Sequence, residues 1–187
     1  MEKNNLDADT SVFGMHPKDN IKNLSAGFEN TVKELIQVLS SFGQEEMNTV
    51  PFESSWTAGQ VGEHLLKSYF VVETLNGKVQ QTQRDPEEKV EKIKALFLNF
   101  DVKLNSPEFI LPSNNTIEKQ SLLSSLEKVL TQIGDVIKTK EPSETCLDYA
   151  IPQFGEFTRL EWINFVIVHT QRHIRQLKGI YQKLQTR

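Results

Sequence analysis

Hydrophobic residues recur along this chain at steps of three and four, the spacing of one face of an α-helix. The stretches that follow this pattern are separated by segments rich in proline, glycine and polar residues. The pattern predicts four long amphipathic helices, over residues 20–42, 57–76, 115–140 and 158–181. A shorter stripe, from residue 85 to about residue 104, predicts an accessory helix between the second and third of these.

Local signals mark where several of these helices begin. Thr57 is followed three positions later by Gln60, and Thr158 in the same way by Glu161. Each pair has the composition of a capping box, in which the side chains and backbone N–H groups of the two residues bond reciprocally. The dipeptide Asp85-Pro86 predicts the start of the accessory helix, with Asp as N-cap and Pro in the first helical position.

Four long amphipathic helices bury their stripes most simply as an antiparallel bundle, so the predicted fold is all-α: a four-helix bundle with an accessory helix. Residues 20–187 form the predicted domain, and the polar residues 1–19 a flexible arm. The segment 105–114 is a predicted connection, compatible with a short extended piece at 109–111, and 141–157 is a predicted loop. The long link between the second and third bundle helices allows a crossover.

Composition bounds the partners and the compartment. The 187 residues are 37% hydrophobic and 25% charged, which is ordinary for one globular domain. The net charge of −4 and the absence of a basic stripe argue against nucleic acid as a partner. A single cysteine, Cys146, permits no internal disulfide and fits a reducing compartment. Neither an apolar signal core nor a membrane-spanning run is present, so we expect a cytoplasmic protein with no membrane partner.

Candidate chemistry lies in the histidines. His169 and His173 fall on the apolar stripe of the last helix, one turn apart, so their Cβ atoms are about 5–6 Å from each other. His64 falls on the apolar face of the second helix and is the candidate third ligand. Three imidazoles from two facing helices can bind one metal ion and leave a coordination position open, the arrangement of catalytic sites. His16, in the arm, is more simply a solvated loop residue.

The alternative is that these histidines are core residues held by hydrogen bonds. A single buried histidine is more often of that kind, but three unpaired imidazoles in one core would be costly without a shared ion or a polar network. The residues therefore favour a metal. The ligand set does not choose it, because imidazole suits zinc, nickel, copper and iron.

Three further residues are candidates for the surroundings of this site. Gln60 lies one turn before His64, Gln176 follows His173 by three positions, and Trp162 could form a pocket wall. Each also has a simpler role, in a helix cap, at the surface or in the core. No general acid or base is identified: Glu161 is explained by its cap, and Glu63 and Arg172 point away from the adjacent histidines, toward solvent or ion pairs. The catalytic residues are therefore unknown.

Two motifs resemble those of the DinB/YfiT-like superfamily. The first is Trp56-Thr57-x-Gly59-Gln60-Val61-x-x-His64-Leu65. The second is Pro152-x-Phe154-Gly155, then Glu161-Trp162, then His169-x-x-x-His173-x-x-Gln176-Leu177. The likeness extends over most of the chain from about residue 20, and the two motifs together are fairly specific.

The resemblance implies a bundle of up-down-down-up order, frequent homodimerisation, and a divalent metal on His64, His169 and His173, with zinc or nickel expected first. Members of the superfamily include metal-dependent hydrolases and S-transferases that use low-molecular-weight thiols such as bacillithiol. Two hypotheses follow for this chain. One is a metal-dependent hydrolase or thiol-dependent S-transferase with a small-molecule substrate, and the other is a non-catalytic, metal-containing binding or stress-response module. A third interpretation, a vestigial site, would leave the histidines as core residues.

Overall fold

The computed structural model describes residues 17–186, with side chains from residue 21 onward. Most of the predicted N-terminal arm, including His16, therefore lies outside the described residues. Residues 17–19 already belong to the first helix, which begins slightly earlier than the hydrophobic stripe indicates.

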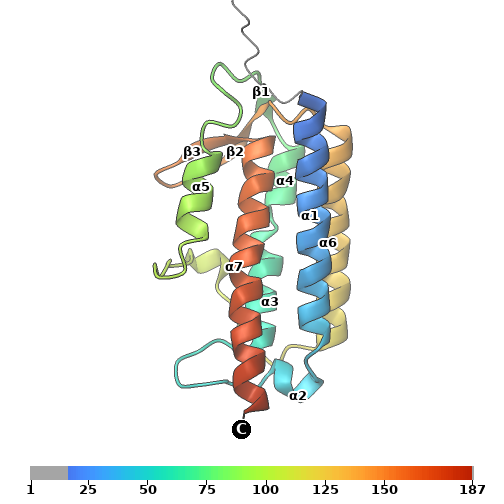
Figure 1. Ribbon diagram of the computed structural model, residues 1–187, viewed down its shortest axis with the longest axis vertical. Helices are drawn as coiled ribbons and strands as arrows, with labels where there is room; N and C mark the ends of the chain where they lie inside the picture. The colour runs from blue at the N-terminus through green and yellow to red at the C-terminus, as the bar shows by residue number, and fades with distance from the viewer. Residues whose placement is uncertain (1–16, 187) are drawn as a thin grey trace, which may run out of the picture.

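Four long helical segments form the body of the molecule (Figure 1). They are α1 (Pro17–Ser40), α3 (Ala58–Ser68) with its continuation α4 (Val71–Asn76), α6 (Lys119–Thr139) and α7 (Arg159–Gln185). Both α1 and α3 pack against α6 and α7, so the four segments enclose one core. In Figure 1, α1 and α7 run downward while α3 and α6 run upward. The chain thus forms a four-helix bundle.

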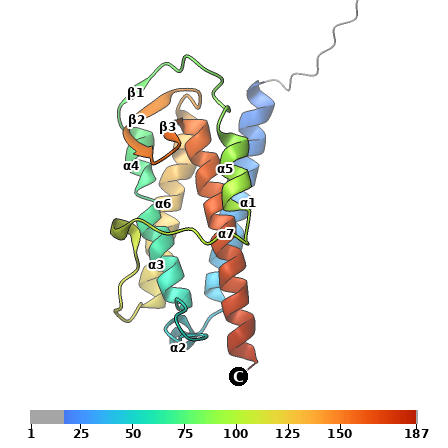
Figure 2. The same ribbon diagram turned by 90° about the vertical axis from the view of Figure 1, so that its left-hand side faces the viewer.

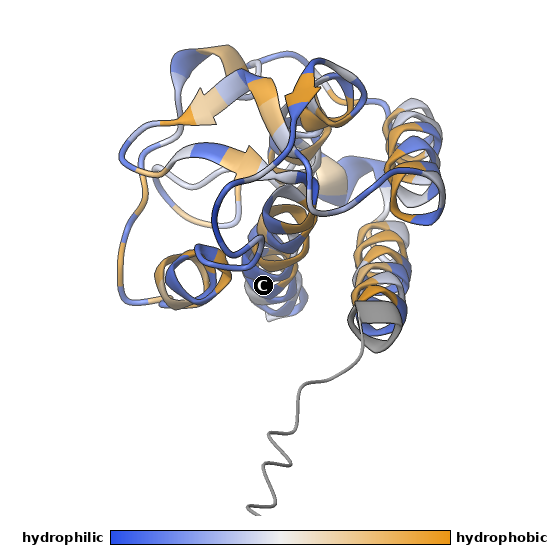
Figure 3. Ribbon diagram, turned by 90° about the horizontal axis from the view of Figure 1, so that it is seen from above, coloured by the Kyte–Doolittle hydropathy of each residue, from blue (hydrophilic) through white to orange (hydrophobic). Residues whose placement is uncertain are grey.

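The core is made by the predicted apolar stripes. Figure 3 shows both apolar and polar positions on the long helices; in an amphipathic helix the apolar positions face the core and the polar ones face outward. Fully buried side chains come from every bundle helix, among them Leu35, Leu65, Leu126, Ile133 and Leu177. Within residues 17–186, no helix combines the length and hydrophobicity needed to cross a membrane.

The second bundle helix is interrupted, although its stripe predicts one continuous helix. Between α3 and α4, Tyr69 and Phe70 form a turn in which Val72 N donates to Tyr69 O and Glu73 N to Phe70 O. Immediately before the turn, the Ser68 hydroxyl donates to His64 O at 2.7 Å, a bond known to bend helices. The interruption therefore follows directly after the turn of helix that contains His64.

Three short helices complete the helical part: α2 (Gln44–Met47), α5 (Val90–Phe97) and the 3-10 turn η1 (Glu108–Ile110). The accessory helix α5 packs outside the bundle against α7 (Figure 2). It begins at Val90 rather than at Pro86, because the start of α7 holds the intervening turn. Thr158 Oγ1 donates to Pro86 O, and Lys89 N donates to Glu161 Oε1. Residues 109–111, where the sequence is compatible with a short extended piece, instead fall largely in the turn η1.

The prediction of an all-α fold is wrong in one region. Strands β1 (Val79–Gln80), β2 (Thr145–Ile151) and β3 (Gly155–Thr158) form an antiparallel sheet in the order β1-β2-β3 at the upper end of the bundle in Figure 1. Ile151 lies opposite Gly155, so the predicted loop is in fact a hairpin. Pro152 lies in its turn and Gly155 is the first residue of β3; Gln153 and Gly155 have positive φ angles of 71° and 72°.

Candidate metal centre

His64 lies on α3, whose start is fixed by the predicted capping box. Gln60 N donates to Thr57 Oγ1 at 3.1 Å, and Thr57 N donates to Gln60 Oε1 at 3.0 Å. The helix that begins at this cap has His64 on its buried face. Its exposed fraction is 1%, and its ring packs against Trp56 with centroids 5.1 Å apart.

The second predicted capping box forms at the start of α7, the helix that carries the other two histidines. Glu161 N donates to Thr158 Oγ1 at 3.1 Å, and Thr158 N donates to Glu161 Oε2 at 3.0 Å. From this start, α7 places His169 and His173 one turn apart on its inner face, with exposed fractions of 7% and 8%. Both caps thus mark where these helices begin, and the packing of the helices in the core keeps the three histidines buried.

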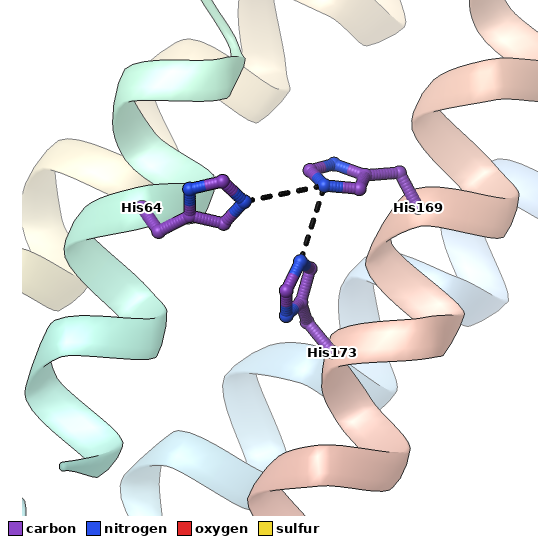
Figure 4. Close-up of side chains that lie close together, drawn as sticks. All are labelled: His64, His169 and His173. Atoms are coloured by element: carbon purple, nitrogen blue, oxygen red, sulfur yellow. Dashed lines mark hydrogen bonds between the residues drawn. The ribbon is translucent and has the colours of Figure 1, made fainter. Parts of the chain in front are cut away.

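The three imidazoles meet between α3 and α7 (Figure 4). The Nε2 atom of His169 lies 3.3 Å from Nε2 of His64 and 3.1 Å from Nε2 of His173, and the potential ligand atoms all lie within 4.8 Å of one another. Nitrogen ligands about 2.0–2.1 Å from one ion are about 2.8–3.0 Å apart at the right angles of octahedral geometry and about 3.3–3.4 Å apart in tetrahedral geometry. The separations of 3.1 and 3.3 Å lie within the span of these values.

Hydrogen bonds at the far side of two rings fix which nitrogen has a free lone pair. Nδ1 of His64 lies 2.9 Å from Ile110 O, and Nδ1 of His173 lies 2.8 Å from Gln176 Oε1. Both partners are acceptors, so each Nδ1 holds the proton and each neutral ring directs an Nε2 lone pair toward His169. A neutral His169 has at most one proton to donate to these two acceptors. The cluster thus has more lone pairs than protons, which suits a cation at its centre.

One nitrogen of the cluster has no protein partner. Nδ1 of His169 is buried without a hydrogen bond among the described residues, as is Nε1 of Trp162. The ring of His169 is instead held by aromatic packing: Phe165 stacks on it at 5.3 Å with an interplanar angle of 10°, and Phe97 meets it edge-on at 5.7 Å. On its Nδ1 side, the His169 ring is therefore held by aromatic packing rather than by a hydrogen bond.

Electrostatics keeps the three rings neutral. Burial, followed by the proximity of His64, lowers the pKa of His173 to about 3. Burial and then the neighbouring His173 hold the pKa of His169 well below its usual value of 6.5, and burial lowers the pKa of His64 as well. Only the neutral imidazole can bind a metal ion, so the site is prepared for one at neutral pH.

The histidines border a pocket of about 310 Å³. Most of its wall is aromatic or aliphatic, including Phe70, Phe97, Phe109, Tyr149, Phe154 and Phe165. None of the described residues that line it is Asp or Glu. The pocket is therefore a largely apolar chamber, in which the three imidazoles are accompanied by a few other polar residues: Ser68, Asn105, Ser106, Gln153 and Arg172.

The other candidate residues lie at different distances from this chamber. Trp162 is buried and lines it, and Gln176 bonds to His173. The Gln60 amide is engaged elsewhere: besides its cap it donates to Ser113 O at 3.0 Å. Glu63 accepts from Ser113 and pairs with Lys67, away from the histidines.

Several residues of the site have no signal in the hydrophobic pattern. Arg172 was expected to face solvent or an ion pair, but its guanidinium donates to Phe97 O at 3.1 Å and Asn99 O at 2.8 Å and also to Val102 O, and it lines the pocket. Tyr149 and Phe154 reach the pocket from the hairpin, whose Gly-containing turn between apolar residues was the available clue.

Comparison with known proteins gives three matches. The family model of the DinB superfamily matches residues 28–177. An uncharacterised protein of Bacillus subtilis strain 168, YuaE, is 26% identical over 151 residues, which cover 79% of this chain and 90% of YuaE. The solved structure of YfiT from Bacillus subtilis, described as a probable metal-dependent hydrolase with an unusual four-helix bundle topology, has a TM-score of 0.58 at 12% identity. The match covers 92% of this chain and 91% of YfiT. At 12% sequence identity, this likeness shows a shared fold.

Proposed function

From the premise that the chain belongs to the DinB superfamily, we propose that it is a metal-dependent enzyme that acts on a small, largely apolar molecule as a hydrolase or a thiol-dependent S-transferase. His64, His169 and His173 would hold a divalent ion, with zinc or nickel expected first. The observation that supports this most directly is the convergence of three neutral imidazoles on the border of an apolar pocket. A closed structural site would have no adjoining chamber.

The residues of the chain have separate tasks in this proposal. Ile110 O and Gln176 orient two of the rings, and Phe165 orients the third. The aromatic wall excludes water and binds the apolar part of a substrate. A divalent ion held there would supply Lewis acidity and lower the pKa of a coordinated water or thiol.

Between the two reactions, the pocket wall favours thiol transfer. Free water has a pKa of about 15.7 and a free thiol one of about 8.5, so at the same metal ion the thiol needs less help from a general base, such as a carboxylate, to lose its proton. None of the described pocket residues is a carboxylate. The sulfur of a low-molecular-weight thiol would then form a bond to an electrophilic carbon as the leaving group departs with the bonding electrons.

Turnover assays with matched variants test the proposal. Purified protein supplied with Zn²⁺ or Ni²⁺ is offered esters and amides, and separately a thiol with an epoxide or alkyl halide. We expect turnover of the electrophile that depends on both thiol and metal and that His169→Ala abolishes. If no ester, amide or electrophile is turned over with any divalent metal, the enzyme proposal fails.

The failure of that assay would favour a non-catalytic module in which the metal only fixes the bundle or a ligand pocket. The missing carboxylate is compatible with such a role. Metal would then raise the melting temperature without any turnover. Homodimerisation and a cytoplasmic location stay predictions from the resemblance and the composition.

A further inference from the structure

A second, larger cleft of about 930 Å³ lies beside the metal pocket. The two hollows share part of their lining: Leu104, Asn105, Ser106 and Arg172 border both. Figure 2 shows the segment between α5 and η1, which contains residues 104–106, passing beside the middle of α7. A molecule in the cleft would therefore be separated from the histidines by one layer of residues.

The cleft also touches two residues that back the histidines. Trp56 lines it and packs on His64, and Gln176 lines it and bonds to His173. A molecule in the cleft would thus contact residues that pack on or bond to two of the three candidate metal ligands, His64 and His173.

The charge of this cleft is of one sign. Lys103, Arg172, Arg175 and Lys183 line it, and none of its described lining residues is Asp or Glu. This is notable in a chain whose net charge is −4. Arg172 is committed to backbone carbonyls and Arg175 stacks on Phe100 at 4.3 Å, but neither forms one of the described ion pairs. The positive charge of the cleft is therefore not neutralised by its own walls.

Gly179 forms part of the cleft on the exposed side of α7. It lies inside a long helix, where glycine is less stable than alanine. No close approach requires it, because a Cβ added there would meet no heavy atom within 4 Å. The missing side chain keeps the cleft open between Arg175 and Lys183. Phe52, Phe100 and Leu111 add exposed apolar surface to the same cleft.

We propose that this cleft is a binding site for a small organic anion with an apolar part, bearing a carboxylate or phosphate group. Its anionic group would bind Lys103, Arg175 and Lys183, and its apolar part would contact Phe52 and Phe100. The concave shape favours a small molecule over an extended partner surface. That the other end of this ligand reaches the metal pocket as substrate or cosubstrate rests on the proposed function, whereas binding in the cleft does not.

Nuclear magnetic resonance offers a direct test, because the chain has two tryptophans, one at each hollow: Trp56 at the cleft and Trp162 at the metal pocket. The full-length ¹⁵N-labelled protein with one equivalent of Zn²⁺ is titrated with 4-phenylbutyrate, phenyl phosphate and the neutral 4-phenyl-1-butanol. We expect a saturable shift of the Trp56 indole signal with at least one of the two anions, and about tenfold weaker binding of the alcohol. The two anions together show which charged group the cleft prefers.

Three variants distinguish the cleft from other surfaces. Arg175→Gln with Lys183→Gln should weaken anion binding about tenfold or more. Gly179→Met should weaken anion binding because its side chain would occupy the cleft between Arg175 and Lys183, while raising the melting temperature because methionine is the better helix former. Lys178→Gln is the control: it removes a charge from the same helix, but Lys178 pairs with Glu34 outside the cleft, so anion binding should not change.

The inference is wrong if the alcohol binds as tightly as both anions, or if Gly179→Met leaves the titration unchanged. Its failure is separable from that of the proposed function. Anion binding without any metal-dependent turnover would sustain the cleft and contradict the enzyme. Turnover that survives Gly179→Met, together with no shift of the Trp56 signal, would support the enzyme proposal and contradict the anion site.

Discussion

Two buried polar clusters lie along α7, one at its start and one at its middle, and they are satisfied in different ways. At the start, the carboxylate of Glu161 is fully enclosed and accepts four hydrogen bonds. Oε1 accepts from Arg84 Nη1 at 2.7 Å and Lys89 N at 2.9 Å, and Oε2 accepts from Arg84 Nη2 at 2.6 Å and Thr158 N at 3.0 Å. Donors and lone pairs are balanced there.

In the histidine cluster at the middle of α7, hydrogen-bond donors and lone pairs are not balanced. His64 and His173 use their protons on Ile110 O and Gln176 Oε1, and three Nε2 atoms then share at most one proton. Buried polar groups are normally paired, so an excess of lone pairs requires an explanation. The hydrogen bonds of the Glu161 cluster are complete within the protein, whereas the histidine cluster would be completed by the cation that we propose.

The largest effect on stability should come from breaking the hydrogen bonds of the Glu161 cluster. Glu161→Ala removes a buried partner of Arg84 and one half of the α7 cap, so we expect a loss of about 3 kcal/mol in the free energy of unfolding. Urea denaturation measures it. The metal content per folded molecule should not change, and a loss of metal in a folded Glu161→Ala protein would show that the clusters are not separate.

The two candidate glutamines provide the next test. Gln176→Ala removes the acceptor that orients His173, and such outer partners contribute about 10–100-fold to metal affinity. Competition with a chelator measures the affinity. Gln60→Ala is the matched variant: it should cost about 1 kcal/mol of stability through the α3 cap and leave the metal affinity unchanged. Equal affinities of the two variants would remove Gln176 from the site.

Acid should separate the clusters further. The pKa of His173 in the folded chain, about 3, lies below the unfolded value of 6.5, so the unfolded chain binds more protons between these two values. Stability is therefore complete above pH 6.5 and falls as the pH drops toward 3, by up to about 1.4 kcal/mol per pH unit for each such histidine.

Urea midpoints of chelator-treated protein between pH 7 and pH 4 measure this slope. In the chelator-treated protein, His173→Gln should flatten this slope. In protein supplied with metal, the slope of the wild-type chain should be steeper than that of a His64→Ala variant, because ligation requires neutral imidazole. Parallel curves for the wild-type chain and both variants would contradict a shared site.

The sequence was sufficient for what is decided locally. Helix faces follow from the spacing of apolar residues, and both capping boxes form as expected, so the inward rotation of His64, His169 and His173 was predictable. The sheet was not, because β2 pairs with a two-residue strand far earlier in the chain, Cys146 opposite Val79. Such non-local pairing leaves no periodic signal.

The same limit applies within the site. The partner of His64 is the backbone carbonyl of Ile110, which any residue type could supply. Arg172 also bonds to backbone carbonyls, so its role in holding the segment after α5 has no signature in residue type. The candidate ligands could therefore be predicted from the sequence, whereas their supports and the pocket wall required the fold.

Elemental analysis of the purified protein tests the central claim most directly, in parallel with a double variant that combines His169→Ala and His173→Ala. The account predicts about one divalent ion per chain in the wild-type protein and less than about a tenth of that in the double variant, with the helical circular dichroism of both retained. A wild-type chain that neither contains nor takes up zinc or nickel, or a double variant that keeps its metal, would contradict it.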